Sequence, residues 1–245
     1  GINWTPKFHT TIWKKTAATT DWNTASNWST GYVPTSDVHV IIPTGATRYP
    51  EISNTGAASK NITINTSATL TINKGYDLTV AGNFTNRGTV TLNSDADEFA
   101  SLIVQGTSSG NIKYKRWVAD EGDTEWDLIG SPVAGQSVSS FVSDNTSLAD
   151  HSTQYAIGVF SNDGSTDTAV AMYTNYTQSV IDVDDPDFVP GQGYAMATDE
   201  ADSPGTTLDF TGTIRTTDLT GIAIDDNTAN APNFGKWNLV ANPYP

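Results

Sequence analysis

The 245-residue sequence contains no cysteine and few cations. The missing cysteine excludes disulfide bonds and zinc sites that use thiolates. Only 12 Lys and Arg residues stand against 27 Asp and Glu residues, so the formal net charge is −15. Because nothing in so acidic a chain gains from neutralising phosphates, nucleic acid and anionic membrane surfaces are disfavoured as partners. The sequence also lacks a run of 18 apolar residues, so we expect no membrane insertion.

The polar part of the sequence is mostly uncharged. Hydrophobic residues make up 37% and charged residues 16%, which leaves much of the surface to Thr, Ser and Asn. Threonine suits strands, whereas Asn, Ser and Gly suit turns. The composition therefore predicts an all-β protein, and the length allows one large β domain or two smaller ones.

A Trp-rich segment, residues 1–35, precedes the first alternating pattern. It holds Trp4, Trp13, Trp22 and Trp28, and DWNTASNW shows neither strand alternation nor a helical face. One interpretation is a cap that covers the open end of a β core. The alternative is an exposed aromatic platform that stacks on sugars, to which Tyr173 and Tyr176 would also contribute.

Residues 36–116 repeat short alternating pairs separated by turn residues such as NTSA, NKGY and NRGT. Ile42, Ile62, Phe84 and Val104 recur at intervals of 20 to 22 residues, although Leu78 has no clear successor. A period of this length predicts a short β-solenoid, in which each coil buries its inward residues against the next. A meander of hairpins is the alternative, because the connections are short.

Residues 117–245 have longer and more widely spaced strand patterns, which predict an antiparallel β-sandwich resembling a jelly roll. Only SVSSFVSDN, near Ser137, suits a short helical turn. Two phrases, WDLIGSP from Trp126 and WNLVANP from Trp237, share the pattern W-x-L-x-x-x-P. We expect each to be a strand with Trp and Leu pointing inward, ended by a proline that cannot donate to the ladder.

Several phrases together resemble a known group of proteins. TDWNTASNWSTGYVPTSDVHVIIPTGATRYPEI, starting at Thr20, is similar to the start of solenoid-like segments in large secreted surface proteins of Bacteroidetes. WDLIGSPVAGQSVSSF, FVPGQGYAMAT, LDFTGTI and WNLVANPYP resemble the module that commonly follows. These proteins are cargo of the type IX secretion system and include adhesin-like proteins. The resemblance implies an extracellular or cell-surface protein, and it carries no catalytic residues over.

Two oxygen-rich loops are candidates for calcium. SNDGSTDT holds Asp163 and Asp167, and DVDDPD concentrates four carboxylates, Asp182, Asp184, Asp185 and Asp187. Calcium takes six to eight oxygen ligands and relieves the repulsion among clustered carboxylates. Neither loop fits the EF-hand pattern, and solvated acidic turns are the alternative. DTA also matches the Bacteroidetes O-glycosylation acceptor, which makes Thr168 a candidate glycan carrier.

Signals for catalysis are weak. GTSSG places Ser108 in a G-x-S-x-G pattern, but another strand pattern follows where a nucleophile elbow needs a helix. His9, His39 and His151 lack the spacing of a metal site, and alternation turns His39 to solvent. No spacing identifies a catalytic pair among the carboxylates.

We therefore expect a non-catalytic structural or adhesive module of a secreted bacterial surface protein. Its partners would be glycans, other surface proteins or further copies of itself. The alternatives are a carbohydrate-binding module of a polysaccharide-degrading enzyme and a subunit of a surface filament.

Overall fold

The computed structural model describes residues 9–122, 126–162 and 172–245. Strands take 39% of the chain and helices 9%, so the protein is mostly β. It forms two compact units, residues 1–114 with Pro245, and residues 115–244. Within the described ranges, no helix has the length and apolar character needed to cross a membrane.

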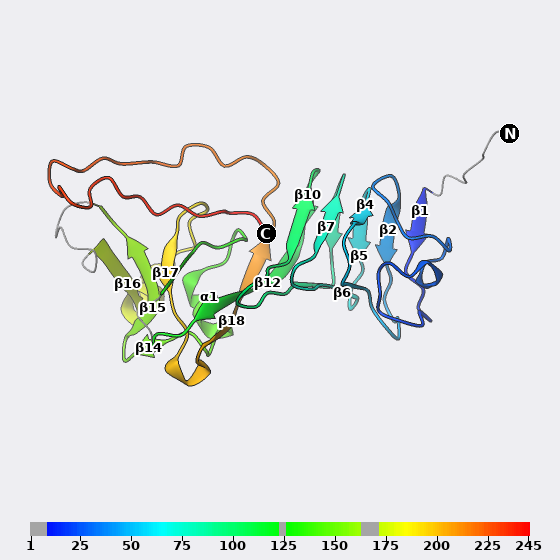
Figure 1. The fold of residues 1–245 in the computed structure, drawn as a ribbon, viewed down its shortest axis with the longest axis horizontal. Helices are drawn as coiled ribbons and strands as arrows, with labels where there is room; N and C mark the ends of the chain where they lie inside the picture. The colour runs from blue at the N-terminus through cyan, green and yellow to red at the C-terminus, as the bar shows by residue number, and fades with distance from the viewer. Residues whose placement is uncertain (1–8, 123–125, 163–171) are drawn as a thin grey trace. The chain divides into compact units, whose positions relative to one another are not determined.

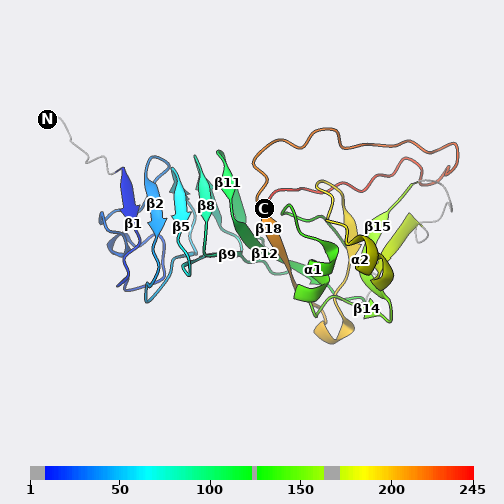
Figure 2. The same ribbon diagram turned by 180° about the vertical axis from the view of Figure 1, so that it is seen from behind.

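The first unit is a parallel β-solenoid of about three turns spanning residues 40–114, as predicted. Each full coil contributes one strand to each of three parallel sheets, which excludes the hairpin meander (Figures 1 and 2). One sheet has the order β1-β2-β5-β8-β11, made by Thr10–Ile12, His39–Ile42, Ile62–Ile64, Phe84–Asn86 and Ser108–Ser109. The second has the order β4-β7-β10, made by Ala57–Ser59, Asp77–Val80 and Ser101–Val104. The third contains β3, β6, β9 and β12, made by Glu51–Ile52, Thr69–Ile72, Thr89–Leu92 and Asn111–Ala119.

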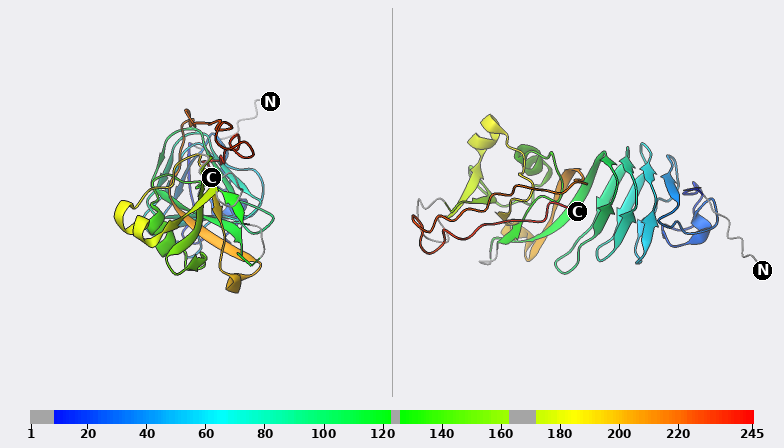
Figure 3. Two further views of the ribbon diagram at one scale, coloured as in Figure 1. Left: turned by 90° about the vertical axis from the view of Figure 1, so that its left-hand side faces the viewer. Right: turned by 90° about the horizontal axis from the view of Figure 1, so that it is seen from above.

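The register differs in detail from the alignment suggested by the sequence. Val40 pairs with Ile62 and Ile62 with Phe84, whereas Ile42 pairs with Ile64 rather than with Ile62. Val104 belongs to a different sheet, where it pairs with Val80. Leu78 does have a successor, Leu102, which lies directly beside it on β10. The repeat is therefore irregular in length but regular in stacking (Figure 3).

Alternation along each short strand builds the interior of the solenoid. Ile42, Ile64, Leu70 and Ile72 are at most 1% exposed, whereas the residue that precedes each of them on its strand is more exposed. His39 follows the same rule and lies on the outer side of β2, as expected. Because every inward side chain contacts the equivalent position of the next coil, apolar burial is continuous along the stack.

The turns of the solenoid are joined by side-chain hydrogen bonds between coils. Asn73 Nδ2 donates to Ser53 Oγ at 2.7 Å, and Asn93 Nδ2 donates to Asn73 Oδ1 at 3.1 Å. At another corner, Asn61 Oδ1 accepts from the Asn83 backbone N–H at 2.8 Å. These ladders satisfy polar groups that stacking would otherwise bury without partners.

One corner of the solenoid requires glycine. A Cβ atom at Gly88 would lie 2.2 Å from the Ala68 carbonyl oxygen and 2.6 Å from that of Asn65. Both neighbours are backbone atoms, so neither can move aside as a flexible side chain would. The preceding coil therefore fixes glycine at this position.

The second unit contains a C-terminal antiparallel sheet, as predicted. Its order is β13-β17-β15-β14, with β16 also paired to β15. These strands are Asp127–Ile129, Tyr194–Met196, Gln154–Phe160, Asp150–His151 and Tyr173–Thr177. β18, Gly205–Thr213, neighbours β12, and Lys115 Nζ lies 3.2 Å from Asp209 Oδ1. The chain also has short 3-10 helices at Ala25–Asn27 and Glu200–Asp202.

Two α-helices accompany this sheet. α1, Val138–Asp144, occupies the place where a short helical turn was predicted, and Ser137 Oγ caps it by accepting from the Ser140 backbone N–H. α2, Gln178–Asp184, was not predicted, because the sequence favours an oxygen-rich loop at Asp182 and Asp184, which instead lie on the helix. Its N-cap is Thr177, whose Oγ1 accepts from the Val180 backbone N–H at 3.4 Å.

An aromatic cluster forms the core of the second unit. Phe141 of α1 lies with its ring centroid 4.6 Å from that of Phe210 on β18, and 5.1 Å from that of Phe188. Phe188 in turn lies 5.1 Å from Tyr194 of β17, nearly perpendicular to it. All four side chains are at most 2% exposed. The cluster joins α1, β17 and β18 through burial and edge-to-face contacts.

The inward orientation predicted for the two W-x-L-x-x-x-P phrases is wrong. Leu128 is 58% exposed and its neighbour Ile129 is buried instead. Trp237 is 65% exposed, and its phrase makes only a single antiparallel bridge, between Val240 and Gln192. The sequence similarity between the phrases therefore does not reflect two equivalent core strands.

The asparagine ladder generates a prediction about stability. Asn73→Ala removes two side-chain hydrogen bonds, to Ser53 and from Asn93, whereas Asn93→Ala removes only the bond to Asn73. We expect Asn73→Ala to lower the free energy of unfolding by about 1–3 kcal/mol and Asn93→Ala by about half as much. Urea denaturation followed by tryptophan fluorescence checks this, and equal losses in the two variants would contradict the ladder.

Candidate functional site

The tryptophans proposed as a sugar platform are buried. Trp13, Trp22 and Trp28 are each 0% exposed, and Trp28 lies edge-on to both others at centroid distances of 5.0 and 4.8 Å. Trp28 Nε1 donates to the Trp22 carbonyl oxygen and Trp13 Nε1 to that of Arg48. These three side chains therefore cannot stack on a glycan. Trp4 lies outside the described residues.

The same cluster supports the alternative interpretation of a cap. β1 pairs with β2 at the edge of the first sheet, and Asp21 forms a parallel bridge with Glu51 at the start of β3. Residues 10–28 thus follow the path of an incomplete coil. Asn27, which is 0% exposed, holds the loop by donating to the carbonyl oxygens of Thr19 and Asp21. The cap covers the end of the apolar interior of the solenoid.

Tyr173 and Tyr176 are only partly exposed. Tyr173 packs edge-on against Phe160 at a centroid distance of 5.3 Å, and burial raises the pKa of its hydroxyl. Burial also raises the pKa of Tyr176, opposed by a side-chain hydrogen bond to Tyr194. The two rings belong to the packing around β15, β16 and β17, so no row of exposed aromatic rings joins them to the buried tryptophans.

The candidate calcium residues of DVDDPD do not converge. Asp182 and Asp184 lie on α2, Asp185 is its C-cap, and Asp187 follows. Asp182 Oδ1 accepts from Gln178 Nε2, and Asp185 Oδ1 accepts from the Ser139 backbone N–H. Across the described ranges, no group of three or more His, Asp or Glu residues is placed to hold a metal ion. Asp163, Asp167 and the candidate glycan carrier Thr168 fall outside those ranges.

The residues weighed for catalysis are also separated. Ser108 begins β11, which lies parallel to β8 within the solenoid, so it occupies a sheet rather than a strand-to-helix turn. His151 Nε2 contacts Glu121 Oε2 at 3.0 Å on the surface of the second unit. His9 and His39 belong to the first unit.

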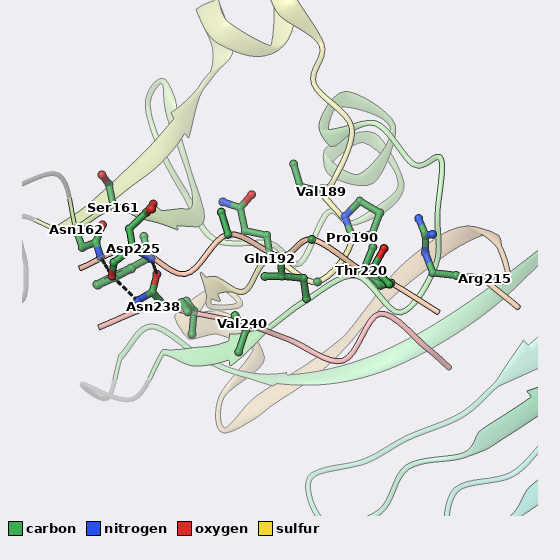
Figure 4. A pocket seen from close by; sticks show the side chains of 17 residues that line it. Ser161, Asn162, Val189, Pro190, Gln192, Arg215, Thr220, Asp225, Asn238 and Val240 are labelled. Atoms are coloured by element: carbon green, nitrogen blue, oxygen red, sulfur yellow. Dashed lines mark hydrogen bonds between the residues drawn. The ribbon is translucent and has the colours of Figure 1, made fainter. Parts of the chain in front are cut away.

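A pocket of about 550 Å³ lies in the second unit (Figure 4). Four segments line it: the end of β15, the stretch before β17, the chain after β18 and the last extended segment. Its polar side chains include Gln192, Arg215, Thr220, Asp225 and Asn238. Aliphatic side chains fill the space between them, so the pocket combines apolar walls with a few polar groups, as small-ligand sites do.

The pocket exists because side chains hold the C-terminal segments in place. Asn162, 8% exposed, donates through Nδ2 to the carbonyl oxygens of Asp225, Gly235 and Trp237 at 3.0–3.1 Å. Asn238 exchanges two hydrogen bonds with the Asp225 backbone, both 3.0 Å long. The extended segments are therefore fixed by asparagine side chains rather than by a continuous strand ladder.

Glycines allow the last segment to approach β13 and β17 closely. A Cβ atom at Gly193 would lie 2.5 Å from Leu239 Cγ, and one at Gly130 would lie 2.3 Å from Ala241 Cβ. The backbone N–H of Gly193 donates to the Leu239 carbonyl oxygen, and that of Ala241 donates to the Gly191 carbonyl oxygen. One wall of the pocket is thus formed by the antiparallel contact between the last segment and the chain around Gly193. Residues larger than glycine at positions 130 and 193 would prevent this contact.

Sequence reasoning missed this pocket. Its lining comes from stretches between residues 160 and 240, and although two of them belong to the phrases FVPGQGYAMAT and WNLVANP, neither phrase indicated a pocket. The available signal was TGIAI, residues 220–224, an alternating apolar segment that no prediction used. Arg215, one of only 12 cationic residues, was a second unused signal.

Comparison with known proteins identifies a family. Residues 12–245 match the family described as a domain of unknown function, DUF8693, and the chain belongs to it. No curated protein and no solved structure matches the chain.

The buried tryptophan cap predicts a large loss of stability upon truncation. Trp28→Ala should lower the free energy of unfolding by about 3–5 kcal/mol, because it empties the centre of the cluster. Tyr32→Ala, at a ring that is 59% exposed, should change it by less than about 0.5 kcal/mol. Chemical denaturation of both variants checks this, and a fully stable Trp28→Ala protein would rule out the cap.

Tyr194 predicts a loss of stability at alkaline pH. Burial raises the pKa of its hydroxyl to about 12, while an unfolded tyrosine titrates near 10. The contribution to stability is therefore complete below pH 10 and declines as pH rises from 10 towards 12, where the unfolded chain releases its proton first. Tyr173 and Tyr176 act in the same direction.

Replacing Tyr194 by Phe tests this assignment. The variant should show a shallower decline of the unfolding midpoint between pH 10 and 12. It should also lose about 1–2 kcal/mol at neutral pH, because the Val189 backbone N–H loses its acceptor at 2.9 Å. An unchanged alkaline slope in thermal melts would contradict the assignment.

Proposed function

We propose that this DUF8693 chain is a non-catalytic structural and adhesive module of a large secreted bacterial surface protein. The solenoid unit serves as the scaffold, and the second unit presents a binding surface. The observation that carries the proposal is the set of large apolar side chains that remain exposed at the pocket rim and on the segments that form it.

The exposed rim is unusual for so polar a protein. Val189 and Val240 line the pocket and are each 52% exposed. Ile224 and Trp237, each 65% exposed, are next in sequence to residues that line it. Single exposed apolar residues need no explanation, but a group of them around a concavity is typical of a binding surface. Tryptophan in particular contributes strongly to binding at protein interfaces.

The solenoid is suited to support rather than to chemistry. Each coil contacts only its neighbours, so the stack is a repeated unit in which apolar burial and asparagine rungs recur. Outward positions carry small polar residues, such as Thr71 and Thr91 on paired strands β6 and β9. Such a surface remains hydrated while the interior holds the strands in register.

The extracellular location rests on the resemblance of two sets of phrases to secreted surface proteins of Bacteroidetes. The first set, from Thr20 to Ile52, forms the cap and the first coil of the solenoid. The second set contributes α1, β17, β18 and the segment around Trp237.

The burial of Trp13, Trp22 and Trp28 takes three of the six rings from the aromatic platform that the carbohydrate-binding alternative uses. Among the residues that line the pocket, Phe160 is the one aromatic side chain. The adhesive interpretation therefore favours a protein ligand over a polysaccharide.

A bead assay tests adhesion. Beads coated with the purified chain should attach to cultured Bacteroidetes cells several-fold more often than uncoated beads. Trp237→Ala combined with Ile224→Ser should reduce attachment at least threefold, because it removes the two most exposed large apolar side chains of the segments that form the pocket. Val183→Ala, at an 80% exposed position on α2, is the matched control and should not change attachment. Equal attachment of coated and uncoated beads would contradict an adhesive role.

A further inference from the structure

The chain from Thr220 to Ile224 runs along the pocket, with Gly221 in the left-handed backbone region (φ +76°) and Ile222 to Ile224 following it. All five residues are exposed, and they adopt neither helix nor strand. None of their backbone groups makes a hydrogen bond to any described residue. An exposed run of unpaired N–H and C=O groups with alternating apolar side chains is a template for pairing with another strand.

We propose that this pocket binds an extended peptide that pairs with the backbone of residues 222–224, placing an acidic group at Arg215 and a basic group at Asp225. This deepens the proposed adhesive function, on which it rests, by naming the class of ligand. Strand addition supplies affinity through main-chain hydrogen bonds, and flanking side chains supply specificity.

Arg215 supplies the cationic end of the site. Its Nε is buried and has no hydrogen-bond partner among the described residues. No carboxylate of the described chain pairs with its guanidinium, although the chain holds 27 Asp and Glu residues. A partly buried, unpaired guanidinium is costly, and a carboxylate is the ligand group that satisfies its planar donors best.

Asp225 supplies the opposite end. Figure 4 shows Arg215 and Asp225 at the two ends of the pocket, with Gln192 and Thr220 between them. The backbone of Asp225 is fixed by Asn162 and Asn238, so its position is determined while its exposed carboxylate has no partner among the described residues. The two charges therefore define a direction for the bound peptide.

The space between the charges suits alternating apolar side chains. Val189, Leu219, Ile222 and Val240 line it, and about 550 Å³ accommodates the side chains of a few residues. In an extended peptide every second side chain points to one face. Those side chains would cover the exposed rim, while the others remained in solvent.

Self-pairing of this edge is disfavoured by charge. An antiparallel pair of two copies centred on Ile222 would place Asp218 of each copy opposite Asp226 of the other. Like charges directly opposite one another destabilise a ladder, and each chain carries a net charge of −15. A separate peptide with one basic end avoids this repulsion.

Selection from a phage-displayed library of random peptides on the immobilised full chain tests the proposal. We expect enriched peptides to alternate apolar and polar residues between an acidic and a basic position. The synthesised peptide should bind about tenfold more weakly after Arg215→Gln, after Asp225→Asn, or when methyl groups block its backbone nitrogen atoms. Lys236→Gln, at an exposed lysine outside the pocket, is the matched control and should leave the affinity unchanged.

A double-mutant comparison assigns the acidic contact. Changing the acid of the peptide to its amide should weaken binding to the native chain about tenfold, but should have little further effect on Arg215→Gln. The proposal would be overturned if no peptide were enriched, or if Arg215→Gln left the affinity for the peptide unchanged. It would also be overturned if a uronic-acid polysaccharide displaced the peptide. If coated beads still attached to cells after such a result, the peptide site would be wrong but the adhesive function would still be supported. The failure of the peptide site and the failure of the adhesive function are therefore distinguishable.

Discussion

The in-register stacking of coils is the constraint on which the first unit depends. Each strand of the solenoid is only two to four residues long within a coil, too short to be stable alone, and it gains stability from the strand above and below. Register decides which side chains meet: Ile62 lies between Val40 and Phe84, and Leu78 lies between Ala57 and Leu102. The hydrogen bonds between asparagine side chains and the glycine at position 88 follow from the same distance between coils, because the corners of successive coils must stack as closely as their strands.

The second unit is stabilised in a different way, since its strands do not form a repeat. An aromatic cluster from α1, β17, β18 and the stretch around Phe188 replaces the continuous apolar column. The chain after β18 then runs without regular structure, held by Asn162, Asn238 and the hydroxyl of Tyr244, which accepts from the Leu219 backbone N–H. These side-chain hydrogen bonds fix the segment at a few points and leave the backbone between Leu219 and Asp225 without hydrogen-bond partners among the described residues. This is how an ordered segment can keep an edge that is open for binding.

Tryptophan serves two opposite purposes in this protein. Trp13, Trp22 and Trp28 close the end of an apolar interior, where a ring covers more area than any other side chain. Trp237 stands 65% exposed on a latched segment, where the same area is available to a partner. The proposed adhesive role follows from this second arrangement and from the open edge beside it.

Local pattern determined much of this fold from the sequence alone. Alternation in β2, β5, β6 and β9 and a repeat near twenty residues predict a β-solenoid, and SVSSFVSD predicts a short helical turn at α1, because both patterns are visible along the chain itself. Tertiary structure decided what depends on distant partners. Coil lengths vary, so only stacking pairs Ile42 with Ile64, and burial of the tryptophans depends on the coil beneath them. The pocket brings together residues between 160 and 240, whose positions are fixed by side-chain hydrogen bonds between segments. No local sequence pattern predicts hydrogen bonds between segments so far apart in the chain.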